Sequence, residues 1–204
     1  MTPPAERPEL RVDFVNGGFA KNDNFFHNLL APHYRLVLHD KPDFVFYNHD
    51  GHKHRLLNAV RIFWTQEAYQ ADFGECDFAL STFAPRHDRE FRLPYYAQVM
   101  APGDLVRPAG LDYEKISAEH TEFCAFVASY ANRNTTARVD FFHRLGQYKR
   151  VDSGGRLFNN IGGPVPGGFE GKRAWLRKYK FHLAFENRAV ANYITEKLPD
   201  ALRE

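Results

Sequence analysis

The stretch that most constrains the fold lies near the C-terminus, where YKFHLAFEN spans residues 179–187 and NYITEKL spans residues 192–198. Apolar and polar residues alternate through the first run, which predicts a β-strand. The second run predicts the start of a helix, with Asn192 or Thr195 available as a capping side chain. A strand that leads through a polar loop into a helix directs backbone N–H groups and the positive end of the helix dipole to one edge of a sheet. The sequence therefore predicts an anion site at this turn.

Four polar side chains would lie on or beside this turn: Asn187, Tyr193, Glu196 and Lys197. Together they supply the donors, acceptors and positive charge that a phosphate and a sugar require, and a diphosphate sugar would use all four. Glu196 and Lys197 are neighbours in the sequence, and successive side chains point about 100° apart on a helix. We therefore expect these two residues to have separate roles.

The first half of the chain alternates short apolar runs with turns and short helical segments. Four runs predict strands: residues 10–15, 34–38, 44–47 and 59–64. This alternation predicts an α/β fold with a Rossmann-like layer. Residues 101–120 contain turn residues and lack strong periodicity, so we expect them to hold the boundary between two lobes. The predicted domains are residues 1–118 and residues 119–204.

The composition is that of an ordinary soluble globular protein, with 44% apolar and 25% charged residues. A net charge of +2 is too small to indicate a nucleic-acid-binding protein. The two cysteines, Cys76 and Cys124, form neither a zinc knuckle nor a disulfide framework, which favours a reducing compartment. No apolar run reaches the ~18 residues of a membrane-spanning helix, and the first residues contain no apolar signal-peptide region. We therefore expect a cytoplasmic protein without a transmembrane segment.

One histidine-rich segment could supply metal ligands: His49, Asp50, His52 and His54. Its spacing matches no standard zinc pattern, and the intervening glycine and lysine are typical of a solvated loop. We therefore prefer a plain loop here, and the sequence predicts no metal site.

Glu67 follows the run at residues 59–64, whose sequence AVRIFW predicts a buried strand. A carboxylate just beyond the C-terminal end of a strand lies where α/β folds place their ligands. Trp64 and Tyr69 would shield it in part from water, which suits a general base. A solvent-facing glutamate at the start of a loop explains the same position equally well, so position alone leaves both interpretations open.

Arg138 lies in the first turn of a predicted helix that Thr135 or Thr136 can cap. A cation at this end of a helix is disfavoured by the helix dipole, unless an anion binds between the two. The alternative is a surface arginine on an amphipathic helix, which is the commoner fate of a single arginine.

The two C-terminal runs closely resemble the signature of the α-1,3-fucosyltransferases, glycosyltransferase family 10, whose usual form is close to YKFxLxFENS…DYITEKL. Three further runs are similar to bacterial members of the family: CDFAL at residues 76–80, FRLPYY at residues 91–96 and YKRVDSGGRLFNNIGG at residues 148–163. The resemblance implies two Rossmann-like lobes of the GT-B type. It also implies that L-fucose is transferred from GDP-fucose to a hydroxyl of an N-acetylglucosamine-containing glycan, with inversion.

The resemblance also implies roles for the candidate site residues. Glu67 occupies the place of the family's general base, although Gln66 stands where bacterial members often have glycine. Arg138 and Lys197 would stabilise the diphosphate of the donor. Asn187 and Glu196 would bind sugar or ribose hydroxyls, and Tyr193 would pack beside the donor. The chain contains no D-x-D triplet, so we expect no metal-bridged donor binding and no required cofactor.

Members of the family continue beyond the NYITEKL run, so we expect this chain to be a truncated member whose second lobe is incomplete. Two other functions stay open: an inactive remnant or non-catalytic nucleotide-sugar-binding module, and a transferase for a different nucleotide sugar. Animal members carry a membrane anchor before the catalytic domain. Its absence predicts a cytoplasmic protein of the bacterial type, with at most peripheral association with the inner membrane.

Overall fold

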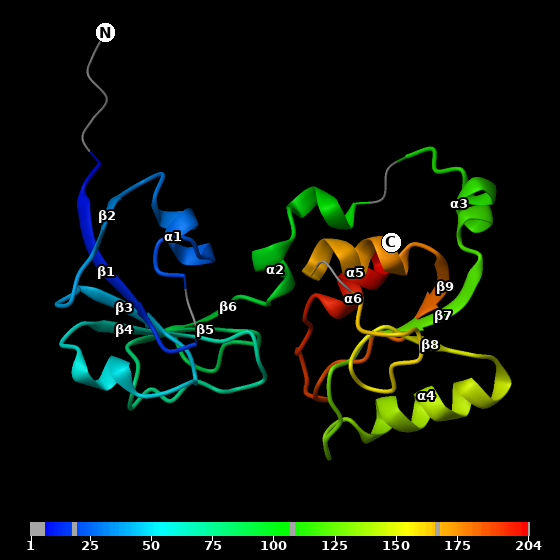
Figure 1. Cartoon of the computed structure of the whole chain (residues 1–204). Coiled ribbons are helices and arrows are strands. Elements are labelled where there is room, and N and C mark those ends of the chain that lie inside the picture. The colour runs from blue at the N-terminus through cyan, green and yellow to red at the C-terminus, as the bar shows by residue number, and fades with distance from the viewer. Residues whose placement is uncertain (1–6, 18–19, 107–108, 166–167, 204) are drawn as a thin grey trace, which may run out of the picture. The chain divides into compact units, whose positions relative to one another are not determined.

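The computed structural model describes residues 7–17, 20–106, 109–165 and 168–203. The chain divides into two compact units, Met1–Pro94 and Tyr95–Glu204. Each unit contains a parallel sheet with helices beside it, as predicted for an α/β protein (Figure 1).

The first unit is built on a six-stranded parallel sheet with the order β2-β1-β3-β4-β5-β6. Its strands are β1 (Glu9–Val15), β2 (Arg35–Leu38), β3 (Phe44–Tyr47), β4 (Val60–Trp64), β5 (Phe78–Ser81) and β6 (Glu90–Arg92). Helix α1 (Phe25–Leu30) connects β1 to β2, and the 3-10 helix η1 (Lys53–Leu56) lies between β3 and β4. The chain leaves β1 toward β2 and returns on its other side to β3, which makes a switch point at the C-terminal ends of these strands. All four strands predicted for this half of the chain are confirmed.

Two apolar layers cover the two faces of this sheet, because successive side chains of a strand point to opposite faces. One layer contains Val15, Val45, Tyr47, Phe63, Cys76 and Ala79. The other is rich in aromatic rings and contains Val12, Phe14, Phe26, Phe46 and Trp64. Phe26 of α1 stacks on Phe46 at 4.7 Å and meets Trp64 edge-on at 5.4 Å, so α1 is held against this face.

His54 belongs to the core of the first unit, although the sequence analysis expected a solvated loop. The residue is 2% exposed, and its ring stacks on Tyr47 with the centroids 3.7 Å apart. Nδ1 lies 3.0 Å from Asn16 Nδ2, and Nε2 lies 3.3 Å from Glu75 Oε2. These contacts suit a neutral ring with its proton on Nε2. Burial lowers the pKa of His54, and the hydrogen bond with Glu75 opposes this effect.

The other histidines of this segment lie elsewhere. His49 stacks on Tyr69, with the ring centroids 4.0 Å apart, and His52 is exposed. In the parts of the chain that the structure describes, no group of three or more His, Cys, Asp or Glu residues is placed to hold a metal ion. The histidine-rich segment thus contributes one side chain to the core and one to the C-terminal edge of the sheet.

The second unit contains a three-stranded parallel sheet with the order β8-β7-β9. Its strands are β7 (Glu122–Phe126), β8 (Asp152–Ser153) and β9 (Tyr179–His182). Its helices are α2 (Tyr96–Val99), η2 (Pro102–Leu105), α3 (Tyr113–Glu119), α4 (Thr136–Tyr148), α5 (Gly168–Leu176) and α6 (Lys197–Arg203). Figure 1 shows α4 on one side of this sheet and α5 and α6 on the other. Phe142 of α4 packs with Phe126 on the first side, and Leu176 of α5 packs with Ala125 on the second.

The boundary between the units differs from the one that the sequence suggested. We expected it after residue 118, whereas the compact units divide after Pro94. The segment that lacked periodicity folds into the short helices α2, η2 and α3 and belongs to the second unit. One contact that attaches it is the ion pair between Asp104 of η2 and Arg203 of α6, at 3.0 Å.

None of the helices in the described residues is both long enough and apolar enough to cross a membrane.

Replacement by alanine should have opposite effects on the free energy of unfolding at two glycines of the second unit. A Cβ atom on Gly155 would lie 2.0 Å from the carbonyl oxygen of Ala128, so Gly155→Ala forces the backbone apart. Gly146 lies exposed within α4, and its Cβ would meet nothing within 4 Å. We expect Gly155→Ala to lower the free energy of unfolding by about 1–3 kcal/mol. Gly146→Ala should raise it by about 0.5–1 kcal/mol. Urea unfolding followed by circular dichroism measures both changes in free energy. Equal effects of the two substitutions would contradict the close approach of Gly155 to Ala128.

The buried His54 predicts a pH dependence of stability. Its folded-state pKa is lowered, so on acidification the unfolded chain takes up the proton first. The stabilisation is therefore present above the ordinary histidine pKa of about 6.5 and is lost as the pH falls below it. Urea unfolding of the wild type and of His54→Gln at several pH values isolates this contribution. The difference between them should shrink from pH 7.5 to pH 5.5, and a difference that stays constant over this range would contradict the prediction.

Candidate functional site

Arg138 is the central side chain of the site in the second unit. It lies in the first turn of α4 and is 3% exposed. Its Nη1 donates a hydrogen bond of 3.0 Å to Asn187 Oδ1, and its Nη2 donates to the carbonyl oxygen of Tyr130. The structure therefore brings together two predicted site residues that lie far apart in the sequence. The interpretation of Arg138 as a surface arginine is wrong.

The electrostatic surroundings of Arg138 are unusual for a buried cation. Among the described residues, no carboxylate forms an ion pair with its guanidinium, and Nε is buried without a hydrogen-bond partner. Burial lowers the pKa of Arg138, which is the sign of an incompletely compensated positive charge. Because an unpaired buried charge destabilises a fold, an arginine in this state is suited to bind an anion such as a phosphate.

Lys197, the first residue of α6, is the second cation of the site. Its Nζ lies 3.1 Å from Thr195 Oγ1, 3.4 Å from Glu196 Oε1 and 3.7 Å from Glu186 Oε2. Glu186 directly precedes Asn187, the partner of Arg138. The two predicted cations are therefore connected through two consecutive residues in the loop that follows β9.

Glu186 is a member of this site that the sequence analysis missed. Its carboxylate accepts a hydrogen bond of 2.7 Å from the backbone N–H of Thr195 and one of 2.8 Å from the Thr195 hydroxyl. It thereby closes the loop between β9 and α6 and provides a counter-ion for Lys197. The sequence carried one signal for it, because Glu186 is a polar residue within an otherwise strand-like run beside Asn187.

The start of α6 differs from the expectation. The helix begins at Lys197, so Tyr193 and Glu196 precede it. The prediction that helical geometry separates Glu196 from Lys197 is wrong, because the two side chains form an ion pair. Of the proposed capping residues, Thr195 accepts from the backbone N–H of Lys197 at 3.4 Å, whereas Asn192 has a φ of 64° and reverses the chain. Tyr193 is 4% exposed and packs within the unit.

Glu67, the predicted base, lies at the C-terminal edge of the sheet in the first unit. The backbone N–H of Glu67 donates to Thr65 Oγ1 at 3.1 Å, and its carbonyl oxygen accepts from the backbone N–H of Tyr69 at 2.8 Å. Thr65 is 1% exposed, so this turn is anchored in the core immediately after β4. Glu67 itself is partly exposed, which leaves it accessible to a ligand.

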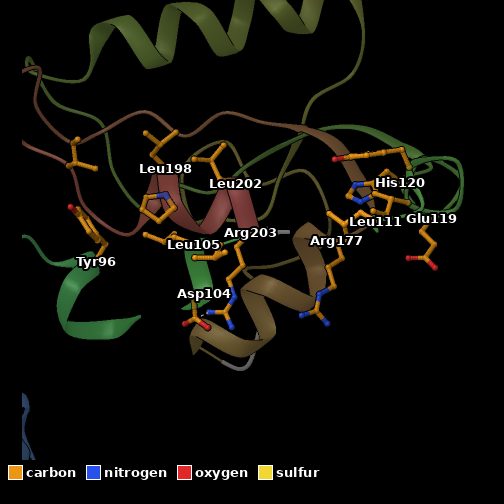
Figure 2. A pocket seen from close by; sticks show the side chains of 15 residues that line it. Tyr96, Asp104, Leu105, Leu111, Glu119, His120, Arg177, Leu198, Leu202 and Arg203 are labelled. Carbon is orange, nitrogen blue, oxygen red and sulfur yellow. Dashed lines mark hydrogen bonds and ion pairs between the residues drawn. The ribbon is translucent and has the colours of Figure 1, made fainter. Parts of the chain in front are cut away.

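A cavity of about 990 Å³ lies in the second unit, apart from the predicted site residues. Apolar side chains dominate the part of its wall that α6 and the segment before β7 contribute, such as Leu105, Ile116, Leu198 and Leu202. Figure 2 shows Asp104 and Arg203 facing each other at its rim, where they neutralise each other. None of the residues predicted to bind a diphosphate lines it, and its apolar wall is a poor match for a phosphate.

Two family models match the chain. The model of the Alpha-(1,3)-fucosyltransferase FucT N-terminal domain matches residues 11–99. The C-terminal model of glycosyltransferase family 10 (fucosyltransferase) matches residues 117–204.

Individual relatives agree with these models. Alpha-(1,3)-fucosyltransferase FucT of Helicobacter pylori is 29% identical over 235 residues, which cover 95% of this chain and 48% of the relative. Alpha-(1,3)-fucosyltransferase 4 of Mus musculus is 35% identical over 117 residues, which cover 57% of this chain and 25% of the relative. The chain thus spans about half the length of the Helicobacter pylori relative, and its match to the Mus musculus relative covers a quarter of that protein.

Solved structures show the same fold. A crystal structure of an α1,3-fucosyltransferase with GDP-fucose matches with a TM-score of 0.73 and 25% identity, over 98% of this chain and 68% of the solved one. A structure described without a ligand matches with a TM-score of 0.77 and 25% identity, over 98% and 67%. The expected α/β fold of the GT-B type is therefore confirmed. With one model of the family on each side of residue 100, this chain belongs to glycosyltransferase family 10, the fucosyltransferases.

Proposed function

We propose that this protein transfers L-fucose from GDP-fucose to a hydroxyl of an N-acetylglucosamine-containing glycan, with inversion at the transferred carbon. The observation that carries the proposal is the buried guanidinium of Arg138, which has no carboxylate partner among the described residues and is oriented by Asn187. The Helicobacter pylori relative is named an α-(1,3)-fucosyltransferase, and a solved neighbour contains GDP-fucose. Both support GDP-fucose as the donor.

On the donor side, the reaction needs positive charge at the departing diphosphate. When the bond between fucose C1 and the β-phosphate oxygen breaks, its electron pair stays on that oxygen and GDP leaves with an additional negative charge. Arg138 stabilises this charge through guanidinium N–H donors, including the buried Nε that has no hydrogen-bond partner among the described residues. Lys197 supplies the second cation. In this proposal these side chains neutralise the leaving group, and no metal ion or other cofactor is invoked.

The remaining predicted donor residues orient these cations and the sugar. Asn187 accepts from Arg138 with Oδ1, and its amide group can donate to a sugar or ribose hydroxyl. Glu196 and Glu186 hold the ammonium group of Lys197 before the donor binds. Tyr193 is a buried residue of the same loop and would pack beside the donor.

On the acceptor side, Glu67 would act as the general base. Its carboxylate would accept the proton of the acceptor hydroxyl while the hydroxyl oxygen attacks fucose C1 from the face opposite GDP, which produces inversion. The hydrogen bond to the buried Thr65 limits the motion of the Glu67 backbone. Less conformational entropy is therefore lost when Glu67 is positioned against the acceptor.

We also propose a cytoplasmic location. Cys76 and Cys124 are both free thiols and both buried, which is typical of proteins from reducing compartments.

Removing the guanidinium tests the donor site. Arg138→Ala should weaken the binding of GDP by about 10- to 100-fold, the effect of losing charge-assisted hydrogen bonds. Isothermal titration calorimetry measures this, with Arg144→Ala, an exposed arginine of the same helix, as the matched control. Circular dichroism verifies that Arg138→Ala is folded. Unchanged GDP affinity in a folded variant would contradict the assignment.

Glu67→Gln tests the reaction itself. The amide cannot accept the proton, so kcat for transfer from GDP-fucose to an N-acetylglucosamine-containing acceptor should fall by about 10²- to 10⁴-fold. GDP affinity should stay near the wild-type value because Glu67 does not touch the diphosphate in this mechanism. Asp40→Asn, whose side chain is 87% exposed in the same unit, is the control. Wild-type turnover by Glu67→Gln would refute Glu67 as the general base. If the wild-type protein binds the donor but transfers no fucose, the protein is a nucleotide-sugar-binding module instead.

A further inference from the structure

An aromatic pair lies beside Glu67 at the C-terminal edge of the first sheet. The imidazole of His49 stacks on the ring of Tyr69, with the centroids 4.0 Å apart and an angle of 19° between the planes. His49 follows the end of β3 by two residues, and Tyr69 follows the end of β4 by five. Because β3 and β4 are parallel neighbours, their ends bring both rings to the same edge. We refer to His49 and Tyr69 as the aromatic platform.

The turn that positions Glu67 also positions the platform. Thr65 Oγ1 accepts from the backbone N–H of Glu67 at 3.1 Å and lies 3.5 Å from His49 Nδ1. The backbone N–H of Tyr69 donates to the carbonyl oxygen of Glu67 at 2.8 Å. A single buried hydroxyl and one tight turn therefore hold the His49 ring, the Glu67 backbone and the Tyr69 backbone close to one another.

The platform differs in its exposure from the aromatic side chains of the core. Phe14, Phe26, Phe46 and Trp64 are each between 2% and 8% exposed. Tyr69 is 47% exposed despite its contact with His49, and the His49 side chain is 25% exposed. Aromatic surface is therefore presented to solvent at the edge of a parallel sheet, where α/β folds bind their ligands.

The charge beside the platform indicates what kind of ligand it suits. Glu67 follows Thr65 by two residues, and the carboxylate of Asp50 lies 3.6 Å from His49 Nε2. Two carboxylates disfavour a phosphate at this place, whereas they accept hydrogen bonds from hydroxyl groups. A neutral sugar combines such hydroxyls with an apolar face of C–H groups, whose partial positive charge complements the negative face of an aromatic ring.

We propose that the aromatic platform binds a pyranose ring of the acceptor glycan and directs one of its hydroxyls toward Glu67. This inference rests on the proposed function and adds to it the side chains that select the acceptor. Tyr69 supplies the stacking surface, and His49 supports it from behind. Neither residue exchanges a proton with the substrate, so both act as positioning residues for the acceptor.

Substitutions of Tyr69 separate stacking from other effects. Tyr69→Leu removes the ring but keeps an apolar side chain, and Tyr69→Phe keeps the ring and loses only the hydroxyl. Phe78→Leu is the matched control, because Phe78 is 40% exposed and begins β5 at the opposite edge of the same sheet. All are made in the 204-residue chain and checked by thermal unfolding.

Acceptor binding is measured without turnover by saturation-transfer difference NMR and calorimetry, with N-acetyllactosamine as the probe and no donor present. Tyr69→Leu should weaken binding about fivefold to tenfold, the size of an aromatic stacking contribution. Tyr69→Phe and Phe78→Leu should bind as the wild type does. In transfer assays, Tyr69→Leu should raise the KM for the acceptor by a similar factor and leave kcat and GDP affinity nearly unchanged.

The outcomes distinguish this inference from the proposed function. Wild-type acceptor affinity and KM in folded Tyr69→Leu would overturn the platform, even if fucose transfer is observed. An equal loss of affinity in Tyr69→Leu and Phe78→Leu would also overturn it, because it would reflect stability alone. Binding of N-acetyllactosamine that depends on the Tyr69 ring, in a chain that transfers no fucose, would support the platform and refute the transferase.

Discussion

The hydrogen bond from Arg138 to Asn187 is the interaction on which the proposed donor site depends. It joins the first turn of α4, which follows β7, to the loop after β9, and β7 and β9 are neighbours in the sheet order β8-β7-β9. The contact compensates the guanidinium only in part, because Asn187 offers a neutral oxygen and no carboxylate of the described residues forms an ion pair with Arg138. A buried cation in this condition is stabilised further by an anionic ligand. Fold stability and donor recognition are therefore linked at one side chain.

The two cations are held in different ways, which suits different roles. Arg138 is fixed by burial and by neutral oxygen acceptors, so its orientation is set before a ligand arrives. Lys197 is balanced by Glu186 and Glu196, and its ammonium group can exchange one of these partners for a phosphate oxygen. Glu186 also closes the loop through Thr195, so it sets where Lys197 begins its helix. In the first unit, the hydroxyl of Thr65 plays the comparable part for Glu67 and the aromatic platform.

Much of the fold was predictable because the strands are short, apolar and separated by clear turns. The sequence predicted strands β1 to β4 of the first unit from their apolar runs, and it predicted the start of α4 from Thr135 and Thr136, whereas β5 and β6 were not predicted as strands. The unit boundary was not predictable, because residues 95–118 have little periodicity and join the second unit through side-chain contacts such as Asp104 with Arg203. The burial of His54 also escaped prediction, since its polar neighbours in the sequence indicate a loop while Tyr47, Asn16 and Glu75 enclose it from other segments.

The sequence by itself determined the class of fold, the family resemblance and the identities of the polar residues at the strand ends, because these follow from local patterns. Tertiary structure alone decided which of these residues meet. It showed that Arg138 is buried with no counter-ion among the described residues, that Glu186 and Asn187 together connect the two cations, and that His49 and Tyr69 stack near the turn of Glu67. The physical reason is that parallel strands distant in sequence end at one edge, so contacts between their loops depend on strand order and register, which no local pattern encodes.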